Sequence, residues 1–279
     1  MTDSQQSEQS EKIEPVEQEV QQETQKENEI VTAAAPVRTY KAKGRVFGMS
    51  VAVLAIWAAL YIVASAIPAL PVPGMAGMIT INAIMTAISG MVLGPAAAIA
   101  NAAGGIVSMI LFPYGFSAGP LGFLTVTMGG LVAGLLMANK WVLAAIAEVL
   151  IIGSWFINPQ SWQTGMWLVP LPYSAIALLV IVIKPVRDWV RKSILTQNKV
   201  WMWPAVFLMC TVGHAAEFLT TNTMVNWMFN LSWQYWVPTL PYWILVDTVV
   251  ILASSLVGVG VMIGLKKARL PLFTESLDK

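Results

Sequence analysis

Four ionisable side chains lie within or beside long apolar stretches of this chain: Glu148, His214, Glu217 and Asp247. A charged residue at the centre of a membrane helix costs about 2.5–3.5 kcal/mol on insertion scales, so such residues persist where a cavity or a partner solvates them. Cys210, His214 and Glu217 follow the i, i+4, i+7 spacing of one helix face. These groups are expected either to line a polar binding cavity or to hold helices together by hydrogen bonds.

The chemistry open to these groups is binding rather than catalysis. The single histidine, His214, cannot supply a multi-histidine metal centre or a bis-histidine haem site. Neither a Gly-x-Ser-x-Gly nucleophile motif nor a Walker-type phosphate loop occurs. We therefore predict no enzymatic activity, no catalytic residue, no cofactor and no metal. His214, Glu217 and Asp247 are expected to orient an amine, a hydroxyl or a ring nitrogen of a ligand.

A long aromatic segment, residues 222–242, precedes the last apolar stretch. It contains no charged residue and is punctuated by asparagines, which is typical of a loop that stacks on a largely neutral, planar ligand and orients it through amide groups. Together with the three ionisable groups, the predicted substrate-binding residues in this segment are Asn226, Trp227, Trp233 and Trp236.

Apolar residues make up 57% of the 279 residues and charged residues only 11%, more than a water-soluble core of this size needs. Stretches of about 17–25 apolar residues suit helices that cross a hydrocarbon layer of roughly 30 Å. The predicted fold is an all-α integral membrane bundle of eight helices, with spans at 46–67, 78–93, 95–112, 120–138, 141–157, 166–184, 201–219 and 243–265.

All 16 Lys and Arg residues fall on one side of the membrane when these stretches are taken as spans. The alternate connections, 68–77, 113–119, 158–165 and 220–242, contain neither residue. The positive-inside rule predicts a multi-pass protein of the cell membrane with both termini in the cytoplasm. The short spans 78–93 and 95–112 are expected to be two helices joined by a tight turn, since a single broken element would upset this alternation.

Two further regions differ from the apolar body. Residues 1–36 are rich in Glu, Gln and Ser and are expected to form a disordered, acidic cytoplasmic tail, while 37–279 form one transmembrane domain. Residues 185–200 resemble a basic amphipathic segment at the cytoplasmic surface. In that segment Trp189 and Ile194 are expected to dip into the membrane interface.

Small-residue motifs recur along the spans, as Gly90-x-x-x-Gly94, Gly130-x-x-x-Gly134, Gly260-x-x-x-Gly264 and Ala55-x-x-x-Ala59. In lipid such spacing lets helix backbones approach closely. Most of these motifs are expected to serve internal packing.

The stretch 91–136 resembles the substrate-binding S components of energy-coupling factor (ECF) vitamin transporters. The shared features are the Leu93-Gly94-Pro95 turn, a Gly-rich helix at 104–105, a Pro-containing connection at 113–120 and a small-residue helix with Gly129-Gly130. The C-terminal part is also similar, because Leu240-Pro241 introduces a final helix that Lys266-Lys267 closes. One feature departs from the family: S components typically have six helices, and 141–184 is a surplus pair.

The resemblance implies capture of a vitamin or similar small molecule from outside, and import driven by separate ATPase subunits and a transmembrane coupling subunit. It also implies that Ala55 and Ala59 meet that coupling subunit. No nucleic acid is expected as a partner. Two rival functions stay open: an ion-coupled secondary transporter that uses Glu217 or Glu148, and a non-transporting membrane scaffold whose acidic tail recruits partners.

Overall fold

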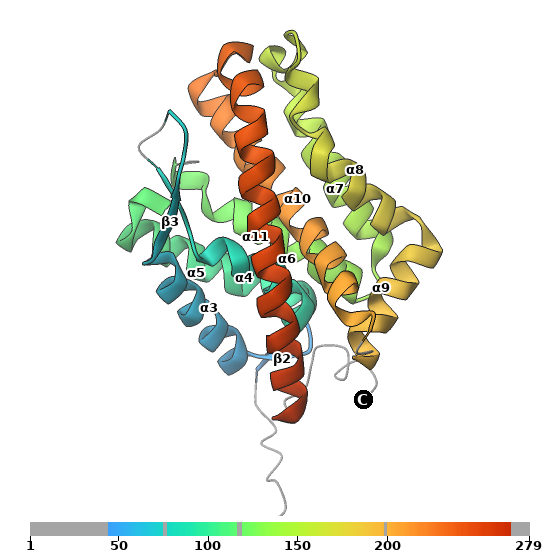
Figure 1. The fold of residues 1–279 in the computed structure, drawn as a ribbon. Coiled ribbons are helices and arrows are strands. Elements are labelled where there is room, and N and C mark those ends of the chain that lie inside the picture. Colours follow the sequence, from blue (N-terminus) through green and yellow to red (C-terminus); the bar gives the residue numbers. More distant parts are fainter. Residues whose placement is uncertain (1–43, 75–76, 116–118, 198–199, 269–279) are drawn as a thin grey trace, which may run out of the picture. The chain divides into compact units, whose positions relative to one another are not determined.

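The computed structural model describes residues 44–74, 77–115, 119–197 and 200–268 (Figure 1). The predicted tail, residues 1–36, lies outside the described residues. The remainder is dominated by helices, which are α3 (Val51–Ser65), α4 (Asn82–Leu93), α5 (Ala97–Leu111), α6 (Phe123–Met137), α7 (Trp141–Ile157), α8 (Leu171–Val182), α9 (Lys184–Thr196), α10 (Met202–Phe229) and α11 (Trp233–Lys267). Each of the eight predicted apolar stretches overlaps one of these helices, and the predominance of helix confirms the all-α class.

Short elements connect the helices. Two antiparallel hairpins pair β1 (Arg45–Val46) with β2 (Met49–Ser50), and β3 (Pro68–Pro71) with β4 (Met78–Thr80). Their register places Pro68 opposite Thr80. The β3 strand lies in the first Lys- and Arg-free connection, 68–77, and β4 falls at the start of the apolar stretch predicted at 78–93. The 3-10 turns are η1 (Gly94–Ala96), η2 (Pro113–Gly115), η3 (Gly119–Leu121), η4 (Pro159–Trp162) and η5 (Met166–Leu168).

The chain reverses sharply at Gly94, between α4 and α5. Gly94 has φ 60° and ψ −147°, a conformation that favours glycine because a Cβ atom would clash. The Asn101 side chain of α5 donates a 2.8 Å hydrogen bond to the Ser89 hydroxyl of α4, so the two helices lie side by side. The structure therefore has two helices joined by a tight turn at this point, within a segment that counts as one candidate span by length and composition.

Glycines let α6 pack against this hairpin and against α10. A Cβ atom added to Gly90 would lie 2.7 Å from the Gly130 carbonyl oxygen, and one added to Gly134 would meet the Gly94 carbonyl group. A Cβ atom on Gly129 would lie 2.7 Å from the Gly213 oxygen of α10. The Gly90–Gly94 and Gly130–Gly134 motifs therefore serve internal packing. In contrast, a Cβ atom on Gly260 or Gly264 would meet none of the described atoms within 4 Å.

Two helices are longer than predicted. The α10 helix continues to Phe229 and α11 begins at Trp233, so most of the aromatic segment 222–242 is helical and the expectation of a loop there is wrong. Pro238 and Pro241 both lie inside α11. Because proline has no N–H, they leave the carbonyl oxygens of Gln234 and Val237 without the usual i−4 donor. Neighbouring groups can satisfy such carbonyls in membrane helices.

The α9 helix is the predicted basic segment, but its apolar side faces the protein. Val190 and Ile194 are buried in the core, so the expectation that Ile194 enters the membrane interface is wrong. The physical reason is the 87° bend between the α8 and α9 segments, which turns α9 back onto α10. Of the basic residues on α9, Arg187 is therefore buried and Lys192 is exposed.

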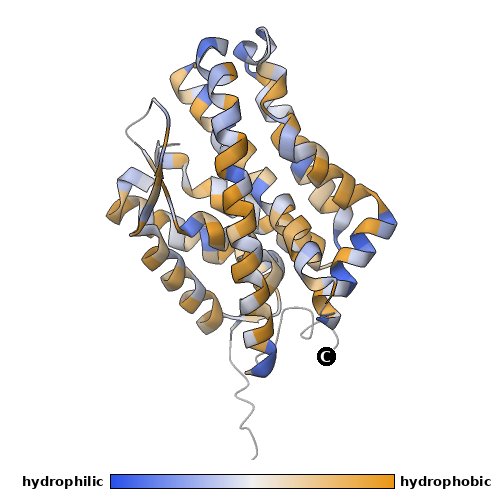
Figure 2. Ribbon diagram, in the orientation of Figure 1, coloured by the Kyte–Doolittle hydropathy of each residue, from blue (hydrophilic) through white to orange (hydrophobic). Residues whose placement is uncertain are grey.

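Four described segments are long and apolar enough to cross a membrane, namely residues 82–111, 119–137, 202–229 and 233–267. The bent pair 166–196 would make a fifth. The first segment contains the α4–α5 hairpin, and α3 and α7 are apolar but shorter. Large apolar side chains are also exposed on the helices, as at Ile56, Leu150 and Leu245. Figure 2 shows hydrophobic residues along much of the length of the helices. These features are compatible with a membrane protein.

The two ends of the bundle differ in composition. At the basic end, α9 meets the end of α6 and the start of α7: the Arg191 side chain donates to the Met137 carbonyl oxygen, and the Arg187 guanidinium lies 4.5 Å from the centre of the Trp141 ring. At the aromatic end, the β3–β4 connection meets α11, where the Tyr235 hydroxyl donates a 2.9 Å hydrogen bond to the Pro73 carbonyl oxygen. We call the aromatic end the described parts of the connections 68–77, 113–119 and 158–165 together with the segment 220–242. These stretches of the sequence contain no Lys or Arg.

Candidate functional site

A pocket opens inside the bundle towards the aromatic end. Its walls come from α3, the β3–β4 hairpin, α4, the start of α6, α10 and α11. The space that the centre of a water molecule can occupy is ≈ 100 Å³. One water needs about 10–15 Å³ by this measure, so the pocket has room for several waters or for a small organic molecule.

Three predicted polar residues, His214, Glu217 and Asp247, meet on one wall of this pocket. His214 and Glu217 are one helical turn apart on α10, with the histidine Nδ1 3.9 Å from Glu217 Oε2. Asp247 comes from α11 and places Oδ1 3.0 Å from the histidine Nε2. The imidazole therefore lies between two carboxylates, close to Asp247 and farther from Glu217, although its Nε2 has no partner with hydrogen-bonding geometry among the described residues.

Several buried polar atoms on the pocket wall have no partner with hydrogen-bonding geometry among the described residues. Oε2 of Glu217 and Oδ2 of Asp247 are such acceptors, while the Asn222 amide nitrogen and the Trp243 indole nitrogen are such donors. The Tyr61 hydroxyl, on α3, belongs to the same set. Buried polar groups are normally paired, so these atoms form a ready set of contacts for a polar ligand.

Trp236 forms part of the aromatic wall and is held in place from two sides. Its side chain is only 1% exposed and lines the pocket. The indole nitrogen donates a 3.3 Å hydrogen bond to the Asn226 side-chain oxygen. The Trp155 ring of α7 meets it edge-on at 5.5 Å. Asn226 is itself fully buried and does not line the pocket, so its place in the predicted site is behind Trp236.

The structure does not bring Trp227 and Trp233 to the pocket. Trp227 is 51% exposed near the end of α10, and Trp233 is 42% exposed at the start of α11. Neither lines the cavity. Because the segment is helical, its tryptophans point in different directions, and of the three predicted binding tryptophans Trp236 alone lines the pocket.

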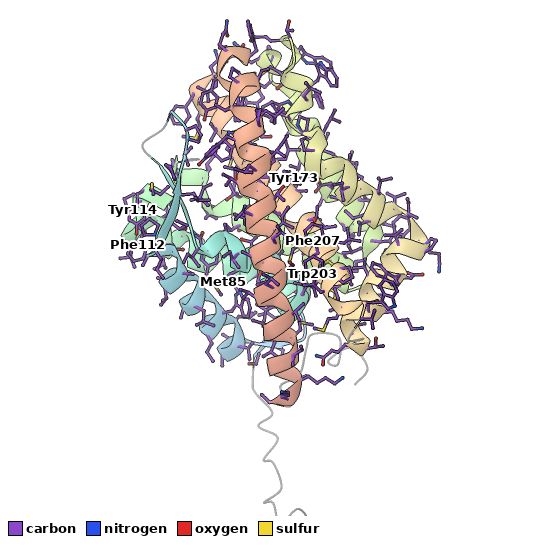
Figure 3. All side chains as sticks on the ribbon, viewed as in Figure 1. Met85, Phe112, Tyr114, Tyr173, Trp203 and Phe207 are labelled. Atoms are coloured by element: carbon purple, nitrogen blue, oxygen red, sulfur yellow. The ribbon has the colours of Figure 1, made fainter. Side chains whose placement is uncertain are left out.

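Helices α7 and α8 do not line the pocket but contact residues of α10 and α11 that do. Tyr173 of α8, labelled in Figure 3, donates a 2.7 Å hydrogen bond to the Ile244 carbonyl oxygen of α11. Its ring meets His214 edge-on at 6.2 Å and Phe218 at 5.9 Å. Sequence reasoning missed this residue and Tyr61. Asn82 also lines the pocket, and its position on the same helix face as Thr86 and Ser89 is a polar stripe that the sequence does show, although Asn82 was not among the predicted binding residues.

Two other predicted positions lie away from the pocket. Ala55 and Ala59 are on the outward face of α3, while Tyr61 on the other face of this helix enters the pocket. Glu148 is fully buried on α7 but does not line the pocket, and its two carboxylate oxygens have no partner with hydrogen-bonding geometry among the described residues.

The basic end has its own electrostatics, on α9. Lys184 Nζ lies 2.6 Å from Asp188 Oδ2 in an exposed i, i+4 pair. This hydrogen bond, with the nearby positive charges of Arg187 and Arg191, lowers the pKa of Asp188 below its usual value. Exposed pairs of this kind contribute little to stability because water and salt screen them.

The site thus combines a polar cluster, an aromatic wall and unpaired donors and acceptors, which suits recognition of a small molecule that bears both ring and polar groups. No family model, no curated protein and no solved structure matches the chain, so the site is interpreted from its own residues alone.

Proposed function

We propose that this chain is a multi-pass membrane protein that binds a small organic molecule in the pocket between α3, α10 and α11. The observation that carries the proposal is the polar cluster of His214, Glu217 and Asp247 inside an aromatic-walled pocket. Ionisable groups inside an apolar bundle mark substrate paths or ligand sites by default. The apolar outward faces of α3, α7 and α11 support a lipid environment.

In this proposal the chain is the substrate-binding subunit of an ECF-type transporter and captures a vitamin-like compound for import. The resemblance over 91–136 supports this role, as does the absence of a Walker motif, because the energy would come from separate ATPase subunits. The pocket also lies beside the first Lys- and Arg-free connection, where outside substrate would enter if the basic end faces the cytoplasm.

Reconstitution tests the function directly. The chain would be placed in liposomes alone, and then with candidate coupling and ATPase subunits, and offered a panel of vitamins. We expect binding by the chain alone, seen as tryptophan fluorescence quenching, and uptake only when the partners and ATP are present. Uptake by the chain alone under a proton or sodium gradient would contradict the proposal.

The contact with the coupling subunit is proposed to use the outward face of α3. Ala55 and Ala59 are exposed there, one helical turn apart, where small side chains permit close approach of a partner helix. Ala59→Leu should abolish ATP-driven uptake and leave ligand affinity unchanged. Loss of folding or of ligand binding would show that this face serves the chain itself.

The proposed topology has the basic end in the cytoplasm. In a Cys210→Ala background, single cysteines at Asn139 and Thr196 would report on the basic end, and cysteines at Thr164 and Asn230 on the aromatic end; all four positions are exposed. We expect a membrane-impermeant thiol reagent to label only Thr164→Cys and Asn230→Cys in intact cells. Labelling of both pairs from outside would contradict the topology.

Glu148 favours one alternative function, an ion-coupled secondary transporter. Its carboxylate is buried on α7 away from the pocket and has no partner with hydrogen-bonding geometry in the described part of the chain. Such a group can carry a proton across a bundle. Gradient-driven uptake that Glu148→Gln abolishes would support this alternative.

A further inference from the structure

The charged residues on the pocket wall are unbalanced. Glu217 and Asp247 contribute two carboxylates, His214 contributes one imidazole, and no Lys or Arg is among the lining residues. With both carboxylates ionised and His214 protonated, one negative charge has no counterpart on the wall. Burying a carboxylate without a partner has a desolvation cost in free energy. A positive group placed beside the carboxylate offsets that desolvation cost.

The geometry indicates which carboxylate is available to a ligand. Asp247 Oδ1 lies 3.0 Å from the His214 ring, whereas the nearest histidine nitrogen is 3.9 Å from Glu217 Oε2. Glu217 is 92% buried, since only 8% of its surface is exposed, and Oε2 has no partner with hydrogen-bonding geometry among the described residues. Glu217 is therefore the less engaged of the two acceptors.

The other walls of the pocket favour a ligand that has a flat ring and at least one hydrogen-bond acceptor. Trp236, Trp243 and Phe218 present aromatic surface to the pocket. Aromatic faces attract a cationic group through the ring quadrupole as well as stacking on planar ligands. The Asn222 amide and the Trp243 indole nitrogen are unpaired donors on the same wall, and they would meet a ring nitrogen or a carbonyl oxygen.

We propose that the pocket takes a planar heteroaromatic compound that carries one positively charged nitrogen, with Glu217 as its counter-charge and Asn222 or Trp243 on a ring acceptor. This inference rests on the proposed function, and narrows the substrate from a largely neutral molecule to a monocation. Compounds whose polar group is a carboxylate are excluded, because they would meet two carboxylates without a neighbouring Lys or Arg.

Three pyridines that differ in charge test the inference: 3-(aminomethyl)pyridine as the cation, 3-(hydroxymethyl)pyridine as the neutral compound and pyridine-3-carboxylate as the anion. Each would be titrated by calorimetry into the full chain in lipid nanodiscs at neutral pH. We expect the cation to bind at least about tenfold more tightly than either other compound, the size of one hydrogen bond to a charged group.

Glu217→Gln should reduce that preference about tenfold and leave the neutral compound unaffected. Asp188→Asn, which removes an exposed carboxylate of α9 outside the pocket, is the matched control and should leave the affinities of all three probes unchanged. If Glu217→Gln fails to fold, Asp247→Asn serves as the second variant and should likewise weaken the cation selectively.

Equal or tighter binding of the neutral or anionic probe overturns the inference, as does an unchanged preference in a folded Glu217→Gln variant. Failure of all three probes to bind also overturns it. The proposed function fails by a different result, namely no ATP-driven uptake of any compound in the vitamin panel by the chain with its partners. A neutral vitamin that is imported would thus reject the charge assignment and keep the transport role.

Discussion

At the basic end the helix backbones pack in direct contact, whereas at the aromatic end the helices are separated by a pocket. Gly134 of α6 lies against the Gly94 turn, and Arg187 and Arg191 find a ring and a carbonyl oxygen there. At the aromatic end Glu217 and Asn222 keep atoms unpaired among the described residues. Close backbone packing thus favours stability at the basic end, whereas the unpaired buried polar atoms at the aromatic end reduce it unless a ligand or water pairs with them.

The largest effect is expected from filling the tight contact at the basic end. Gly134→Val would force its Cβ atom into the Gly94 carbonyl group, where two backbones meet and no side chain can move aside. Overpacking costs about 1–3 kcal/mol where side chains can adjust, and we expect more than about 3 kcal/mol here. Thermal unfolding in detergent would measure the loss. Gly264→Val is the control, because none of the described atoms lies near its Cβ atom.

The next effect is expected at the aromatic end, from Trp236→Phe. This change removes the hydrogen bond to Asn226 and part of the edge contact with Trp155, but keeps an aromatic ring on the wall. We expect a stability loss of about 1–2 kcal/mol and weaker ligand binding. Calorimetric titration and thermal unfolding would measure both. Trp233→Phe should change neither, and equal losses in the two variants would place the site elsewhere on this end.

A comparable change at the basic end should alter stability without altering binding. Arg187→Met removes a 2.9 Å hydrogen bond to the Ile181 carbonyl oxygen and the contact with the Trp141 ring. We expect a loss of about 1–2 kcal/mol in unfolding free energy. Lys192→Met removes an exposed charge from the same helix and serves as the control. A change in ligand affinity in Arg187→Met would show that the two ends are coupled.

The smallest effect concerns the exposed pair of Lys184 and Asp188. The pKa of Asp188 is lowered in the folded state, chiefly by the hydrogen bond from Lys184. The resulting small stabilisation is present above the usual aspartate pKa of about 3.9 and is lost as pH falls through the lowered value. The stability difference between the wild type and Asp188→Asn should therefore vanish in strong acid, and high salt should reduce it at neutral pH.

Sequence reasoning located every apolar helix because apolar runs of this length are a strong local signal. It misjudged where α10 and α11 meet, since the uncharged aromatic segment with its asparagines was interpreted as a loop, whereas most of it is helical. The sequence could not show that Trp236 faces inward while Trp233 does not. The direction of each side chain depends on its position around a helix, and this segment was predicted to be a loop. The cluster of His214, Glu217 and Asp247 was foreseeable, because buried charge in an apolar stretch needs a reason.

Tyr61 and Tyr173 could not have been predicted, because each reaches the site from a helix distant in sequence. Tyr173 belongs to the surplus pair, whose packing behind α10 is a tertiary feature without a local pattern. The sequence also did not predict that α9 packs against the protein, because its amphipathic pattern is equally typical of a helix at a membrane surface.

The close approach of α6 to α10 has a consequence for the order of assembly. Gly129 and Gly213 make this contact, yet α7, α8 and α9 are synthesised between them. At roughly 5–20 residues per second, the roughly 80 residues between Gly129 and Gly213 take roughly 4–17 seconds to emerge from the ribosome. Throughout that interval the face of α6 that meets α10 lacks its partner helix, so we expect the nascent chain to depend on other contacts to cover that face.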